Sequence, residues 1–251
     1  MGILQRIMPS ANAQPIALNA KLLLKIVGML AFLLPVFMLV GVATVPGVCM
    51  RESISGFYFT PVTGDIFVGS LYFIGLFLFT YRGWEGDRTD NLIASFAGAC
   101  SIAIALIPTL GIECTQDIAR MRGYLPTGVG ADPDQYMLFG QVGQWFTSQN
   151  VHLTLAGVFF AVIGYMCIFR FTKTNPDPTH VMTAQKTQRN RLYRICGYVI
   201  WASIVGVALS TKVDVPIGNY QTFKFEFVAL WAFGIAWMVK GELWNLMADH
   251  P

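Results

Sequence analysis

Six long stretches of apolar residues alternate along the chain with shorter segments that carry most of the charges. The stretches cover residues 22–45, 65–81, 92–112, 151–171, 193–211 and 223–239. A transmembrane helix needs about 20 mainly apolar residues, because each residue advances the helix by about 1.5 Å across a hydrocarbon core of about 30 Å. Each stretch comes close to that length. The pattern therefore predicts an all-α protein, an integral membrane bundle of six transmembrane helices.

The composition supports a membrane protein and argues against a soluble domain. Of the 251 residues, 55% are hydrophobic and 12% are charged, whereas soluble domains average about 25% charged residues. The formal net charge of +3 comes from basic residues in the connecting segments, which predicts a role in topology and no nucleic-acid partner. We expect a cytoplasmic lead-in at residues 1–20, a single six-helix domain at 21–242, and a cytoplasmic tail at 243–251.

The lysines and arginines are unevenly divided between the two faces of the predicted bundle. The face that holds the N-terminus carries twelve, namely Arg6, Lys21, Lys25, Arg82, Arg88, Arg170, Lys173, Lys186, Arg189, Arg191, Arg194 and Lys240. The opposite face carries five, namely Arg51, Arg120, Arg122, Lys212 and Lys224. Because positively charged loops are retained in the cytoplasm, this division predicts that both termini are cytoplasmic.

Four ionisable residues fall at the same, extracytoplasmic ends of their predicted spans. They are Asp65, Glu113, His152 and Glu226, and Ser55 lies in the loop that precedes the second span. Ionisable residues close to the membrane interior are costly and by default mark functional sites. We therefore expect these five residues to line a polar pocket that binds a ligand.

Two other interpretations of these residues are open. In the first, His152, Asp65 and Glu226 ligate a divalent metal, with zinc as the cofactor, whereas the pocket interpretation requires no cofactor. In the second, each residue only caps its helix in the wet interface. Asp65 and Glu226 at N-terminal ends would then gain from the helix dipole, and Glu113 at a C-terminal end would not.

The cysteines divide between the two sides of the membrane. Cys49 and Cys114 fall on the oxidising, extracytoplasmic face, while Cys100, Cys167 and Cys196 fall within spans or near the reducing side. A disulfide between Cys49 and Cys114 is therefore expected, because such bonds persist in oxidising compartments.

Small residues inside the spans are expected to serve helix packing, because they let two backbones approach closely. Two such pairs are Gly64 with Gly69, and Gly157 with Gly164.

Several segments carry a family resemblance when they are taken together. They are RESISGFYF, GDIFVGSLYFIGLFLFTYRG, NLIASFAG with Pro108, His152 at the opening of a span, NRLYRICG, and EFVALWAFGIAWMVKGE. Over residues 21–242 the chain resembles bacterial six-span membrane proteins of unknown function, akin to the DUF998 or Frag1/DRAM/Sfk1-like groups. The resemblance implies a multi-pass protein of the bacterial inner (plasma) membrane and names no reaction.

A more distant similarity is to the CREST superfamily of membrane hydrolases, which includes the alkaline ceramidases. That similarity implies a zinc site of Ser, Asp and His at one membrane face, to which Ser53 or Ser55, Asp65 and His152 would correspond. The HxxxH pair that those enzymes carry near the C-terminus is absent from this sequence.

Two function classes follow from these observations. The sequence favours a non-catalytic protein that binds a lipid or small amphiphile in an outward-facing polar pocket, or that is a subunit of a membrane complex. Its partners would be membrane lipids and other membrane-protein subunits. The alternative is a metal-dependent membrane hydrolase that acts on a lipid amide or ester through His152, Asp65 and Glu226.

Overall fold

A computed structural model describes residues 20–83, 88–107, 109, 148–173, 183–210 and 220–242 of the chain. Within these ranges there are six long helices and no strand. The long helices are α1 (Ala20–Thr44), α2 (Thr63–Thr80), α3 (Arg88–Leu106), α4 (Ser148–Tyr165), α5 (Ala184–Ser210) and α6 (Gln221–Lys240). A short 3-10 helix, η2 (Ser55–Phe59), precedes α2, and a π-helical turn, η6 (Met166–Arg170), continues α4.

All six long helices are long and apolar enough to cross a membrane. Each expected apolar stretch overlaps one of them, so the prediction of an all-α bundle with six transmembrane helices is confirmed. The chain is a multi-pass membrane protein.

The largest difference from the expected boundaries is at α5, which begins at Ala184 instead of residue 193. The first turns of α5 have the sequence AQKTQRNR, and Ala, Gln, Lys and Arg are all good helix formers. Hydropathy marks where a chain enters the membrane and not where its helix begins. The basic run from Lys186 to Arg194 was expected in a loop, and it lies on a helix instead.

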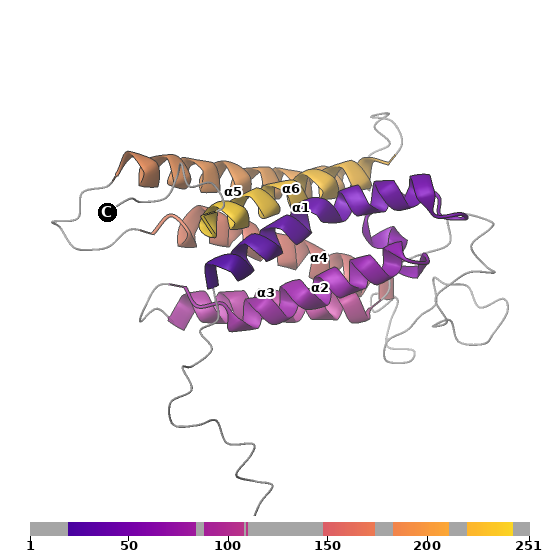
Figure 1. The fold of residues 1–251 in the computed structure, drawn as a ribbon, viewed down its shortest axis with the longest axis horizontal. Helices are drawn as coiled ribbons and strands as arrows, with labels where there is room; N and C mark the ends of the chain where they lie inside the picture. Colours follow the sequence, from indigo (N-terminus) through magenta and orange to yellow (C-terminus); the bar gives the residue numbers. More distant parts are fainter. Residues whose placement is uncertain are drawn as a thin grey trace, which may run out of the picture.

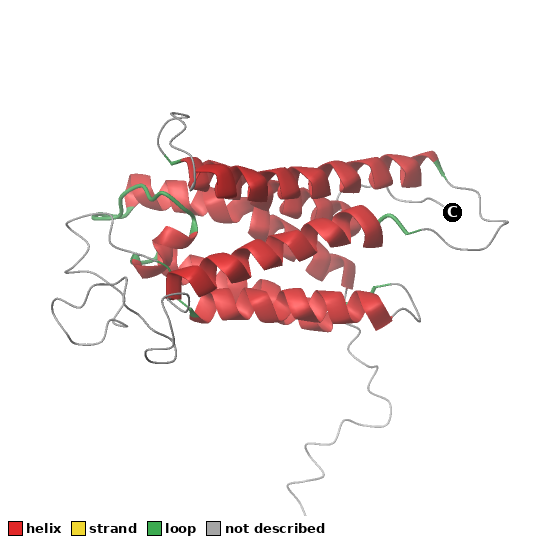
Figure 2. Cartoon of the chain, turned by 180° about the vertical axis from the view of Figure 1, so that it is seen from behind, coloured by secondary structure: helices red, strands yellow, loops and turns green. Residues whose placement is uncertain are grey.

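The six helices form a closed ring in chain order. Each helix packs against the next, and α6 packs against α1 to complete the ring. Figures 1 and 2 show the long axes of the helices running side by side. We call the end of the bundle that holds η2 the η2 end, and the opposite end, where α1 begins and α6 ends, the terminal end.

Three helix pairs cross where two glycines face each other. A Cβ on Gly28 would lie 2.7 Å from the carbonyl oxygen of Gly234, which joins α1 to α6. Gly98 and Gly75 bring α3 and α2 together in the same way, and Gly197 and Gly164 do so for α5 and α4. Such contacts let helix backbones approach closely in a membrane.

In each of the two expected glycine pairs, only one glycine packs closely against another part of the protein. Gly64 and Gly164 do lie against neighbouring atoms, whereas a Cβ on Gly69 or Gly157 would meet nothing within 4 Å.

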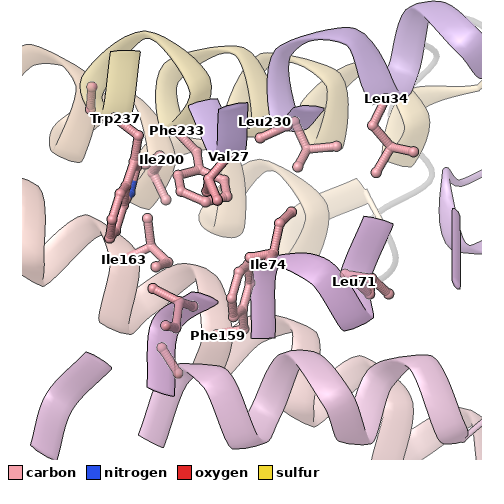
Figure 3. Close-up of a cluster of buried hydrophobic side chains, with 14 of the residues drawn as sticks. Val27, Leu34, Leu71, Ile74, Phe159, Ile163, Ile200, Leu230, Phe233 and Trp237 are labelled. Atoms are coloured by element: carbon pink, nitrogen blue, oxygen red, sulfur yellow. The ribbon is translucent and has the colours of Figure 1, made fainter. Parts of the chain in front are cut away.

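The centre of the ring is filled by apolar side chains (Figure 3). Those labelled in the figure come from α1, α2, α4, α5 and α6, and they are Val27, Leu34, Leu71, Ile74, Phe159, Ile163, Ile200, Leu230, Phe233 and Trp237. Trp237 is fully buried, and its ring packs against those of Phe77, Tyr81 and Phe171 with centroid distances of 5.2 to 5.5 Å. The terminal half of the bundle is thus packed solidly.

Between residues that the structure describes, two ion pairs lie at the terminal end. Arg170, the last residue of η6, forms a buried ion pair with Asp90 on α3, and the two side chains are 10% and 5% exposed. Lys21 and Glu242 form the second pair at 2.6 Å, but their side chains are 62% and 34% exposed. The first pair ties α4 to α3 inside the protein, whereas the second lies on its surface.

Candidate functional site

The segment between α1 and α2 folds into the η2 end of the bundle and covers its centre. Ile54, Ser55 and Phe57 are all buried, and the guanidinium-bearing side chain of Arg51 is fully buried as well. The backbone N–H of Phe223 donates a 2.7 Å hydrogen bond to the carbonyl of Glu52, which fixes the segment against the start of α6. The part of the segment from Ile54 onward is therefore packed into the core, whereas Glu52 before it is exposed.

Glu226 on α6 holds this segment in place. The backbone N–H of Ile54 donates a 2.5 Å hydrogen bond to its carboxylate, and the N–H of Ser55 also donates to it. Ile54 is the N-cap residue of η2 and Ser55 is its first residue, so the carboxylate satisfies backbone groups that a helix N-terminus leaves open. In the alternative interpretation Glu226 would only cap its own helix, but the first turn of α6 contains no acidic residue. It lies further along α6 and caps η2 instead.

His152 on α4 is fully buried beside the end of α3. Its Nδ1 lies 2.6 Å from the carbonyl oxygen of Ile107. Since a carbonyl only accepts, Nδ1 carries the proton in this bond. The other ring nitrogen, Nε2, is buried and has no hydrogen-bond partner among the described residues. An unsatisfied buried polar atom costs about 1–3 kcal/mol, so this atom calls for an explanation.

A small inner cavity of about 40 Å³ lies among His152, Ser55 and Glu226. Its other lining residues are apolar, and they include Phe67, Leu71 and Ile74 of α2 and Phe159 of α4. A cavity needs about 10–15 Å³ of such space to hold one water molecule. The inner cavity is large enough for water that would satisfy Nε2 of His152.

A larger outer cavity of about 400 Å³ opens between α4, α5 and α6 at the η2 end. It shares Ala156, Phe160 and Glu226 with the inner cavity, so Glu226 stands between the two. The polar residues that line the outer cavity are Glu52, Ser53, Thr109, Gln149, Ser203, Thr222 and Glu226. Its apolar lining includes Leu153, Phe160, Ile204, Val207, Phe225 and Ala229, and the backbone of Gly157 contributes to one wall.

The structure brings three of the five expected site residues together. Ser55, His152 and Glu226 all line the inner cavity. Asp65 lies in the first turn of α2, is exposed, and lines neither of these cavities. Glu113 lies outside the described residues.

The candidate metal ligands do not come together in the structure. Among the residues that the structure describes, no group of three or more His, Cys, Asp and Glu side chains could hold a metal ion. The candidate zinc ligands His152, Asp65 and Glu226 do not form such a group.

Cys49 is disulfide-bonded, and Cys100, Cys167 and Cys196 are free. Cys114 lies outside the described residues, so its pairing with Cys49 stays a prediction.

The outer cavity itself was not anticipated from the sequence. Its residues come from three helices, from the segment before η2 and from Thr109 after α3, and most of them are hydroxyl, amide or small residues that also occur in ordinary helix contacts. One signal was available, since Gln149 and Thr222 lie just outside the extracytoplasmic ends of expected spans, whereas Ser203 lies in the middle of one. None of these three residues is charged, so none of them was predicted as a site residue.

Comparison of the chain with protein-family models, with curated proteins and with solved structures finds no match.

Proposed function

We propose that this protein binds a lipid or small amphiphile in the outer cavity and that the binding is non-catalytic. The observation that carries the proposal is the cavity of about 400 Å³ whose lining combines apolar side chains with seven polar ones, Glu226 among them. Ligand sites commonly have volumes of about 300–1,000 Å³, with mainly apolar walls and a few polar groups that fix orientation. The outer cavity has these properties.

A molecule with one polar and one apolar part suits this site better than a wholly polar solute. The side chains of Leu153, Phe160 and Ile204 offer an apolar wall, while Ser203 on α5 and Glu226 on α6 offer polar atoms. A second hollow, between α3, α4 and α5, is lined by Leu92, Phe96, Val158, Trp201 and similar residues without any charged side chain. That hollow supplies nothing that would select a headgroup.

The membrane and orientation are part of the proposal. The division of basic residues and the resemblance to bacterial six-span proteins both favour the bacterial inner membrane, with both termini in the cytoplasm. The η2 end would then face outward, and the outer cavity would be reached from the extracytoplasmic side or from the outer leaflet.

Ligand titration of the wild type and of a variant whose new side chain fills the cavity tests the proposal. The purified chain in nanodiscs would be titrated with n-dodecylamine, n-dodecanol and dodecanoate by calorimetry, with empty nanodiscs as the blank. At least one of the three should bind saturably to the wild type. Gly157→Leu should weaken that binding by about tenfold or more, which corresponds to about 1.4 kcal/mol, because the new side chain projects into open space beside the cavity.

Gly69→Leu is the matched control. Gly69 also lies in a helix, and a Cβ there also meets nothing within 4 Å, but it does not line the outer cavity. Binding should therefore be unchanged in this variant. Equal binding by both variants, or no saturable binding of any of the three compounds, would contradict the proposed function.

A further inference from the structure

The charged residues that are described in the lining of the outer cavity are all acidic. Two of its lining residues, Glu52 and Glu226, are acidic, and no lysine, arginine or histidine of the described part of the chain lines it. The bundle as a whole carries more basic than acidic residues, so this bias is a property of the cavity and not of the chain. An anionic headgroup placed here would meet like charges.

Glu226 has no protein counter-ion among the described residues. No lysine, arginine or histidine side chain of that part of the chain forms an ion pair with its carboxylate. The hydrogen bonds that it accepts come from the backbone N–H groups of Ile54 and Ser55. A carboxylate removed from bulk water is costly unless an opposite charge compensates it. Because Glu226 lines the cavity, a ligand bound there can supply the missing positive charge.

The neighbouring polar atoms also favour a ligand that donates hydrogen bonds. The hydroxyl of Ser203 already donates to the carbonyl of Val199 at 2.9 Å, which leaves its oxygen lone pairs as acceptors. In the inner cavity, His152 uses its Nδ1 proton on Ile107, so Nε2 of the neutral ring is an acceptor as well. Glu226 thus shares the outer cavity with a second acceptor, the Ser203 oxygen, and the inner cavity with a third, Nε2 of His152. A donor headgroup in the outer cavity would suit the first two.

We propose that the amphiphile bound in the outer cavity carries a protonated amine, which Glu226 binds as an ammonium–carboxylate pair. This inference rests on the proposed function, since it names the headgroup for the same cavity. An ammonium group has three donors. One pairs with Glu226, another can reach an acceptor such as Ser203, and the alkyl chain lies along the apolar wall formed by Leu153, Phe160 and Ile204.

The test compares headgroups at constant chain length. In the wild type, n-dodecylamine should bind about tenfold or more tightly than n-dodecanol, and dodecanoate should bind more weakly than either. In Glu226→Gln, which keeps a carbonyl acceptor but removes the charge, the advantage of the amine over the alcohol should fall to about twofold or less. A tenfold ratio corresponds to about 1.4 kcal/mol of binding free energy.

Asp65→Asn is the control for Glu226→Gln. It removes one negative charge from an exposed position at the same end of the bundle, outside the outer cavity, and it should leave the preference for the amine intact. If both variants lost the preference equally, general surface charge would explain it and the pairing with Glu226 would be wrong.

The wild-type comparison decides the inference even if Glu226→Gln does not fold. Dodecanol or dodecanoate binding as tightly as dodecylamine, while Gly157→Leu still abolishes binding, would overturn the amine headgroup and leave the proposed function standing. No saturable binding of any of the three would overturn both.

Discussion

Glu226 and Ile54 are separated by 172 positions in the sequence, yet the carboxylate of one accepts a 2.5 Å hydrogen bond from the backbone N–H of the other. This bond joins α6 to the segment that covers the η2 end. The same carboxylate lines both cavities. One side chain thus fixes the covering segment and contributes the charge that a ligand would meet.

The first prediction concerns this bond. Glu226→Ala should lower the free energy of unfolding by about 1–3 kcal/mol, because the N–H of Ile54 loses its acceptor in a buried place. Glu226→Gln should lower it less, since a carbonyl oxygen remains. The amide hydrogens of Ile54 and Ser55 should also exchange faster with solvent in the alanine variant. Unchanged exchange at both amides would show that the bond does not hold the segment.

The second prediction contrasts the two ion pairs of the terminal end. Asp90→Ala should destabilise the protein by about 3–5 kcal/mol, because it removes the carboxylate of a buried ion pair and leaves the guanidinium of Arg170 buried. Lys21→Ala breaks an exposed pair and should cost at most about 1 kcal/mol. Unfolding by SDS titration in mixed micelles measures both. Similar losses in the two variants would contradict the difference in burial.

The third prediction concerns the glycine crossings. Gly28→Ala should destabilise by about 1–3 kcal/mol, because its Cβ would lie 2.7 Å from a backbone oxygen of Gly234 and the helices would have to separate. Gly69→Ala meets no neighbour and should be neutral or stabilising by up to about 1 kcal/mol, since alanine is the better helix former. The same unfolding titration would reveal any reversal of this order.

The fourth prediction is the orientation of the chain. A cytoplasm-dependent reporter fused after Pro251 should be active, and a periplasm-dependent reporter at the same point should not. The reason is the excess of lysine and arginine on the face that holds the termini. Activity of the periplasmic reporter would reverse the orientation and place the outer cavity on the cytoplasmic side.

The helices were predictable because apolar length alone decides what can cross a membrane. The start of α5 was not, since its first residues are polar yet favour helix. The burial of the segment before η2 was not predictable either. Arg51, Glu52 and Ser53 are typical of an exposed loop. Glu52 is indeed exposed, but Arg51 is fully buried, and Ile54 and Phe57 pack into the ring.

The candidate site was likewise predictable only in part. His152 and Glu226 could be nominated because ionisable residues near the membrane interior are rare. Asp65 was nominated for the same reason, but helix rotation separates it from the site. Successive helical residues are about 100° apart, so Asp65 and Phe67 lie on opposite sides of α2. Phe67 faces the inner cavity and Asp65 is exposed.

Photolabelling would test the central claim most directly, because it reports where an amphiphile lies. A dodecylamine carrying a diazirine on its chain would be irradiated with the protein in nanodiscs, and the labelled peptides identified by mass spectrometry. We predict labels on residues 149–160 of α4, 203–208 of α5 and 222–229 of α6, displaced by unlabelled dodecylamine and lost in Gly157→Leu. Labels confined to the hollow lined by Leu92, Phe96 and Trp201, or labels that no competitor displaces, would contradict binding in the outer cavity.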